Sequence, residues 1–173
     1  MMNILGCLDV PTSGRYELDG VDVKDQSKAE LADIRNQKLG FVFQGFNLLP
    51  KVDAVENVEL PLLYRGVKSS VRRKAAVNAL ERVGLGERLH HRPAQMSGGQ
   101  QQRVAIARAL AGSPSLFIAD EPTGNLDETN ENIVLDLFRQ LHNEGTTLIV
   151  VTHDPEVAEA AQRTIVLEHG RVA

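Results

Sequence analysis

Short apolar stretches alternate with helical segments along this chain, and this alternation constrains its fold more than any other feature. The stretches 41–43, 115–120 and 147–152 are largely apolar at consecutive positions, and polar residues end or follow each of them. Strands that are apolar on both faces are typical of a parallel sheet buried between layers of helices. The sequence therefore predicts an α/β fold, with a mainly parallel sheet and helices on both faces.

Capping residues indicate where the helices begin. A polar helix is expected over 28–38. The expected N-caps of three later helices are Ser70, Ser97 and Asp127. In the last of these helices, apolar residues recur at i, i+4 and i+8, which predicts a core-facing stripe of Ile133, Leu137 and Leu141.

The length of 173 residues suits one domain of ordinary size. Within it, residues 45–66 carry apolar side chains around two prolines, Pro50 and Pro61, and look less regular than the rest. The stretch 45–95 is mostly helical and is expected to form a subdomain inserted into the sheet domain. With the next helix, this subdomain would span about 45–112.

Charge and apolar runs exclude several classes of protein. The net charge is −4, so no basic face for binding nucleic acid is expected. The longest apolar runs, such as 148–151, are far shorter than the roughly 20 residues that span a bilayer. No basic region precedes the apolar start of the chain, so a secretory signal is not expected. The single cysteine fits a reduced, cytoplasmic compartment.

Two acidic residues, Asp120 and Glu121, end the apolar stretch 115–120. Ligands of open parallel sheets bind at the carboxyl ends of the strands. An Asp at such an edge can hold Mg²⁺, which prefers oxygen ligands, and a neighbouring Glu can accept a proton from an attacking water. The alternative is that the pair merely begins a loop and caps the next segment.

A capping box begins the helix after Ser97, because Gln100 follows three residues later. Gly98 and Gly99 lie between them, at a cost to helix stability of roughly 1 kcal/mol each relative to Ala. Close approach of an anion would justify that cost, since a helix N-terminus favours phosphate. The alternative is an ordinary cap.

Two further polar residues stand where strands end. Gln44 follows 41–43, and His153 follows 147–152. If the strands are parallel, both lie level with Asp120 and Glu121. Gln44 could position water or complete a metal shell. A lone His is more often structural than catalytic, and Gln44 could equally be a polar loop residue.

The order of these segments is far more specific than any one of them. Along the chain stand FVFQ, MSGGQQQR, LFIADEP, GNLD and VTHD. In this order they resemble the ATP-binding subunits of ABC transporters, over essentially the whole chain. The run DEPTGNLD, with FVFQGFNLLP and ENVELPLLYRG, looks most like the branch that drives macrolide export and lipoprotein release.

The resemblance implies a P-loop NTPase fold, the cofactors ATP and Mg²⁺, and roles for individual residues. Gln44 matches the Q-loop, Asp120 the end of Walker B, Glu121 the catalytic glutamate, Asp127 the D-loop and His153 the switch histidine. Asp120 and Gln44 would serve Mg²⁺, Glu121 would activate water, and His153 and Gln44 would sense the γ-phosphate. The signature motif, with Met96 where Leu is usual, would grip ATP through Ser97, Gly98, Gly99 and Gln100.

The resemblance also implies partners. Two such domains pair head to tail, and each signature motif then meets the ATP held by the other protomer. A membrane permease would dock on apolar residues between Phe46 and Tyr64, although for several of these local core packing is the alternative. The chain would then be cytoplasmic and peripheral on the inner face of the cell membrane.

One motif of the family is absent from these residues: no G-x-x-x-x-G-K-[ST] segment occurs in them. In the family, sequence similar to residues 2–6 follows that phosphate-binding loop directly. The chain is therefore expected to be incomplete at its N-terminus, without the loop and the strand before it. Three alternatives remain open: a catalytically impaired remnant, an ABC ATPase of DNA repair or translation, and one of cell division or envelope signalling.

Overall fold

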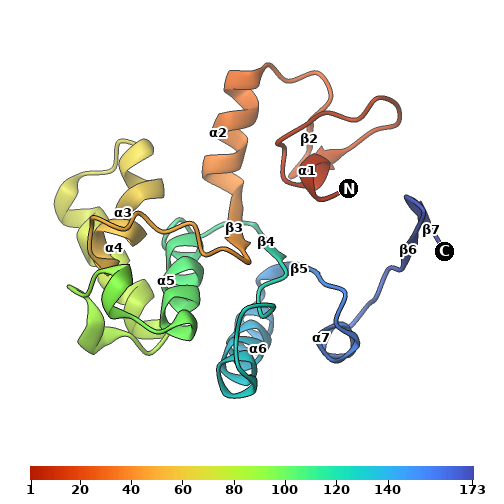
Figure 1. The fold of residues 1–173 in the computed structure, drawn as a ribbon. Helices are drawn as coiled ribbons and strands as arrows, with labels where there is room; N and C mark the ends of the chain where they lie inside the picture. Colours follow the sequence, from red (N-terminus) through yellow and green to blue (C-terminus); the bar gives the residue numbers. More distant parts are fainter.

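Three parallel strands lie at the centre of the computed structural model, which describes residues 1–173 (Figure 1). Their order in the sheet is β3 (Leu39–Phe43), β4 (Leu116–Asp120) and β5 (Thr147–Val151). The register places Phe43, Asp120 and Val151 side by side. The three carboxyl ends therefore form one edge of the sheet, as the sequence predicted.

Side chains alternate between the two faces of this sheet, and each face is covered. Val42, Phe117 and Ala119 belong to a core of 20 buried residues shared with helices. Leu116 and Ile118 point the other way, into a second core of six residues that includes Leu31. Because each face buries its own set of apolar side chains, the predicted parallel sheet with helices on both faces is confirmed.

The helices are α1 (Met2–Leu5), α2 (Lys28–Lys38), α3 (Ala54–Tyr64), α4 (Ser69–Arg82), α5 (Gly98–Ala111), α6 (Glu128–Asn143) and α7 (Pro155–Glu159), with 3-10 turns at Gly86–Arg88 and Pro93–Gln95. Two short hairpins complete the fold: β1 (Glu17–Leu18) with β2 (Val21–Asp22), and β6 (Leu167–Glu168) with β7 (Arg171–Val172). None of the helices combines the length and the apolar character needed to cross a membrane.

Helices α3, α4 and α5 pack against one another as a group on one side of the sheet (Figure 1). Residues 45–66 were expected to be less regular than the rest, but Ala54–Tyr64 within them is a regular helix that continues through Pro61. Asp53 and Glu56 form a complete capping box at its start. Burial of one face of α3 in the core offsets the cost in helix stability of a proline, which has no N–H to donate. Helix propensity alone overestimates this cost, because it does not include burial.

Two local predictions differ from the structure. Helix α4 begins at Ser69 after Lys68, without a side-chain cap, so Ser70 is not the N-cap. Ile133 of α6 is 40% exposed, and the buried stripe consists of Val134, Leu137, Phe138 and Leu141. The predicted Leu137 and Leu141 are therefore in the core, whereas Ile133 is replaced there by Val134 and Phe138, which complete an i, i+3, i+4, i+7 spacing.

Strand β5 is apolar but pairs with β4 alone, so its other edge is free. Its central residues Leu148, Ile149 and Val150 are only half-buried, and Val151 is exposed. An apolar strand with an unpaired edge is a template for pairing with another strand. A strand paired with this edge would cover it. We use the term extended chain for residues 1–173 with such a strand and a G-x-x-x-x-G-K-[ST] loop joined to Met1, and the experiments proposed for this protein use it.

Candidate functional site

Glu121 lies at the carboxyl edge of the sheet, directly after β4. Its backbone N–H donates to Val151 O at 2.8 Å, so the chain stays bonded to β5 one residue beyond the strand. Its φ of +45° is left-handed, a conformation that is uncommon for a residue with a side chain. The backbone therefore turns sharply at Glu121, where the side chain leaves the strand.

The loop after β5 supplies three donors to the Glu121 carboxylate. His153 Nδ1 lies 2.7 Å from Oε1, and the His153 backbone N–H donates to the same oxygen at 3.0 Å. Thr152 Oγ1 donates to Oε2 at 3.3 Å. The hydrogen bond and the negative charge of Glu121 raise the pKa of His153 above its ordinary value. The predicted juxtaposition of these two residues is therefore present.

We expect this pair to be visible in a titration. The folded-state pKa of His153 is raised, so the interaction is complete at low pH and is lost as pH rises through that pKa. Histidine NMR of the extended chain should give His153 a pKa above about 6.5, the ordinary histidine value. In Glu121→Gln it should fall back toward that value, because the neutral amide no longer supplies the negative charge that raises the pKa of His153. An unchanged His153 pKa would contradict the pairing.

Asp120 ends β4, half-buried, and its carboxylate makes no ion pair with any residue of the chain. Gln44 lies at the end of the neighbouring strand, with its Nε2 donating to Asn125 Oδ1 at 3.4 Å. A carboxylate and an amide oxygen are thus available at this edge. No group of three or more acidic, His or Cys side chains is clustered as an all-protein metal site. Mg²⁺ bound with phosphate oxygens needs only one or two protein ligands, so these residues fit it.

Gln44 is interlocked with the segment that follows Glu121. Asn125 Nδ2 donates back to Gln44 O at 3.1 Å, so the two side chains bridge the loops after β3 and β4. A Cβ at Gly124 would lie 2.8 Å from Gln44 Nε2, so a larger residue there would displace the end of the Gln44 side chain. Sequence reasoning did not single out Asn125.

The N-terminus of α5 carries the capping box that the sequence predicts. Ser97 N donates to Gln100 Oε1 at 3.0 Å, and Gln100 N donates to Ser97 Oγ at 3.3 Å. The two glycines differ in their surroundings. Any side chain at Gly99 would overlap Asn130, so packing against α6 explains this glycine without an anion. A Cβ at Gly98 would meet nothing closer than 3.8 Å, so Gly98 leaves the helix end accessible.

Asp127 caps α6 beside this helix end. Its Oδ1 accepts from Asn130 N at 2.9 Å, and its Oδ2 accepts from Asn130 Nδ2 at 2.8 Å. These hydrogen bonds lower the pKa of Asp127. Because Asn130 also packs on Gly99, the first turns of α5 and α6 meet at one point.

A buried residue that sequence reasoning missed joins α5 to the carboxyl edge of the sheet. Gln102 is fully buried, and its Nε2 donates to Pro122 O at 2.5 Å. Pro122 directly follows Glu121. The spacing of the residues in α5 could have indicated its burial. Gln102 precedes the buried residues Ala105 and Ile106 by three and four positions and therefore lies on the same face of the helix.

Comparisons with known proteins agree with this arrangement. The family model that matches residues 1–124 is described as ABC transporter. YvrO of Bacillus subtilis (strain 168), an uncharacterized ABC transporter ATP-binding protein, is 52% identical over 172 residues, which cover 99% of this chain and 75% of that protein. A macrolide export ATP-binding/permease protein MacB, from Syntrophobacter fumaroxidans, is 56% identical over 98% of this chain and 24% of its own length.

A solved structure is similar over nearly the same extent. It is the dimeric post-hydrolysis state of the ATP-binding cassette MJ0796 bound to ADP and Pi. It superposes with a TM-score of 0.88 at 45% identity, covering 99% of this chain and 76% of that one. Fold, motif order and sequence identity therefore agree: this chain belongs to the ABC transporter family, as an ATP-binding domain with the P-loop NTPase fold.

Proposed function

We propose that this chain, joined to a phosphate-binding loop, hydrolyses ATP and thereby powers transport through a partner permease. The observation that carries this proposal is the Glu121–His153 pair at the carboxyl edge of the sheet, next to the free carboxylate of Asp120. A base, a group that orients it and a metal-binding carboxylate are what hydrolysis of a phosphoanhydride requires.

Each residue at this edge has a proposed task. Asp120, with Gln44, would hold Mg²⁺, which neutralises charge on the phosphates when bound. Glu121 would accept the proton of the attacking water, and the Thr152 and His153 donors would keep its carboxylate oriented. Turnover requires that Glu121 be unprotonated, because a protonated carboxyl group cannot take up the proton of the water.

A second copy of the chain would complete the site. Ser97, Gly98 and Gln100 stand at the accessible end of α5, where the capping box occupies the N–H groups of Ser97 and Gln100 and leaves the backbone N–H of Gly98 free to favour a phosphate. Gly99 would contribute its backbone N–H, and Asp127 would couple the two sites through Asn130. The dimeric cassette bound to ADP and Pi supports this arrangement.

Replacing Ser97 with Arg should abolish ATP-driven pairing, since the larger side chain would occupy the space in front of the helix end. Nucleotide binding by the single copy should persist, because that ATP lies on another surface. Gel filtration with ATP, in the extended chain carrying Glu121→Gln, measures the effect. Ser70→Arg, at the exposed start of α4, is the matched control and should pair normally. An ATP-dependent dimer of the Ser97→Arg protein would contradict the assignment.

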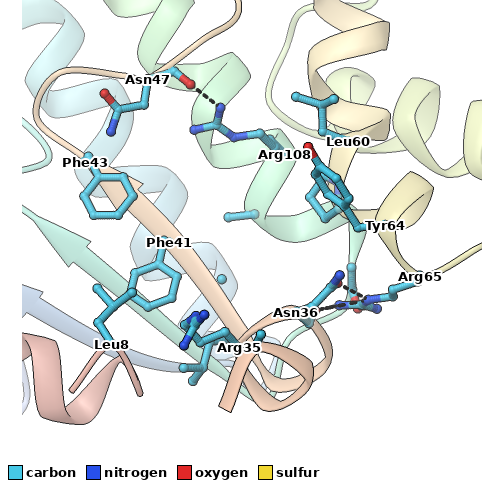
Figure 2. A pocket seen from close by; sticks show the side chains of 16 residues that line it. Leu8, Arg35, Asn36, Phe41, Phe43, Asn47, Leu60, Tyr64, Arg65 and Arg108 are labelled. Carbon is cyan, nitrogen blue, oxygen red and sulfur yellow. Dashed lines mark hydrogen bonds between the residues drawn. The ribbon is translucent and has the colours of Figure 1, made fainter. Parts of the chain in front are cut away.

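The permease is proposed to dock beside α3, which places the chain at the inner face of a membrane. Leu49, Leu63 and Tyr64 are 47%, 48% and 78% exposed, whereas Leu62 is buried in the core. Tyr64 also lines a groove of about 460 Å³, which is formed by residues of α2, β3, α3 and α5 (Figure 2). Docking is thus assigned to the exposed apolar residues, and core packing to the others.

The direct test is phosphate release from ATP by the extended chain, with and without EDTA. Magnesium-dependent release supports the proposed function. Binding of ATP and pairing without any release would support the alternative of a catalytically impaired remnant.

A further inference from the structure

The segment directly after Gln44 holds an unusual backbone conformation. Phe46 has φ +58° and Asn47 has φ +50°, two consecutive left-handed residues that are not glycine. Asn tolerates this conformation, but for a bulky residue such as Phe it is disfavoured. Contacts from elsewhere in the fold must therefore hold this turn, which we call the 46–47 turn.

Arg108, in the last turn of α5, supplies these contacts. Its Nη1 donates to Asn47 O at 2.6 Å (Figure 2). Its Nη2 donates to Phe46 O at 2.9 Å. Arg108 makes no ion pair with any residue of the chain, so both arms of its fork serve the turn. A planar guanidinium suits two neighbouring carbonyls better than an ammonium does.

The 46–47 turn also reaches the other end of α5. A Cβ at Gly98 would lie 3.8 Å from the tip of the Phe46 ring. Ten residues separate Gly98 from Arg108, a rise of about 15 Å along an α-helix. The turn therefore lies along α5, with the Phe46 ring near its first turn and two hydrogen bonds to its last turn.

The same turn borders the groove next to α3. Asn47 and Arg108 line this groove together with Leu60 and Tyr64 (Figure 2). A segment bound in the groove would touch the turn directly. Gln44 is only two residues away from the turn and is itself bonded to Asn125 at the edge of the sheet.

We propose that Arg108 is a positioning residue that fixes the 46–47 turn on α5 and thereby holds Gln44 in place at the edge of the sheet. The inference rests on the proposed function, because that function assigns Gln44 to the ATP site. The physical link itself does not depend on catalysis.

Hydrogen exchange of the extended chain tests the link. The amides of Phe46 and Asn47 are bonded to Phe43 O and Gly45 O and are therefore protected in the folded turn. In Arg108→Met, which removes two bonds from a charged donor, their exchange should be about tenfold faster or more. Arg108→Lys keeps the positive charge but not the planar guanidinium. Its exchange rates at Phe46 and Asn47 should therefore lie between those of the wild-type extended chain and those of Arg108→Met.

Steady-state ATP turnover gives a second measurement, because loss of a purely structural residue would not lower kcat while leaving KM for ATP unchanged. Misplacing Gln44 should lower kcat about tenfold in Arg108→Met and leave KM for ATP within about twofold, since Gln44 acts on the hydrolysis step. Partial recovery of kcat in Arg108→Lys is expected. If KM rose and kcat stayed unchanged, the positioning role would be wrong.

Arg65→Met is the matched control. Arg65 lines the same groove and donates to the carbonyls of Asn36 and Gly112, but to no residue of the turn. It should leave exchange at Phe46 and Asn47 unchanged. The proposal would be overturned if Arg65→Met accelerated exchange at Phe46 and Asn47 as much as Arg108→Met does, or if Arg108→Met did not accelerate it. If the wild-type extended chain released no phosphate, the proposed function would fail, and exchange would still decide the role of Arg108.

Discussion

Replacing Glu121 with Gln in the extended chain is expected to lower ATP turnover by about 10²–10⁴-fold, the range typical for loss of a general base. Gln keeps the size of the side chain but cannot accept a proton from water. Because Glu121 lies beyond β4 and holds no part of the core, ATP binding and ATP-driven pairing should be intact. Single-turnover phosphate release, with nucleotide binding measured in parallel, gives the comparison.

The matched control is Glu81→Gln, an exposed glutamate on α4 that makes no ion pair. It should hydrolyse ATP at the wild-type rate. A Glu121→Gln protein with turnover near wild type would show that another group activates the water. His153→Ala separates the two members of the pair: it removes the ring that contacts Glu121 Oε1 but leaves the carboxylate, so its loss of turnover should be smaller.

Residues 1–173 by themselves are expected to bind Mg-ATP about a thousandfold more weakly than the extended chain. These residues contain no G-x-x-x-x-G-K-[ST] segment, whose backbone amides and lysine hold the phosphates. A hydrogen bond to a charged group contributes roughly 1.5–3 kcal/mol. Three such bonds suffice for a thousandfold difference, although the contributions do not add strictly.

Titration calorimetry of both proteins measures this difference. Circular dichroism of the two should first show equal helix content, so that weak binding is not caused by unfolding. A micromolar dissociation constant for residues 1–173 would contradict the prediction. It would mean that the carboxyl edge of the sheet, with Asp120 and Gln44, binds ATP without the loop.

The main elements of the fold and the members of the site could be predicted from the sequence because their signals are local. Apolar stretches of strand length end at Gln44, Asp120 and Thr152, and parallel strands bring such ends to one edge. The capping box of Ser97 and the N-cap of Asp127 were also correct, since both bond to residues three positions away. The proximity of Glu121 and His153 could therefore be inferred from the sequence alone.

Only the tertiary structure decided which side chains of distant segments pack against one another. Gly99 was expected to leave room for an anion, but Asn130 fills that space. Ile133 satisfies the helical period as well as Val134 does, and only the position of the core shows that Val134 is the buried one. Arg108 lies 61 residues along the chain from Asn47, and the sequence contains no sign of their hydrogen bond. Local signals specify elements and their ends, whereas such contacts depend on how the whole chain packs.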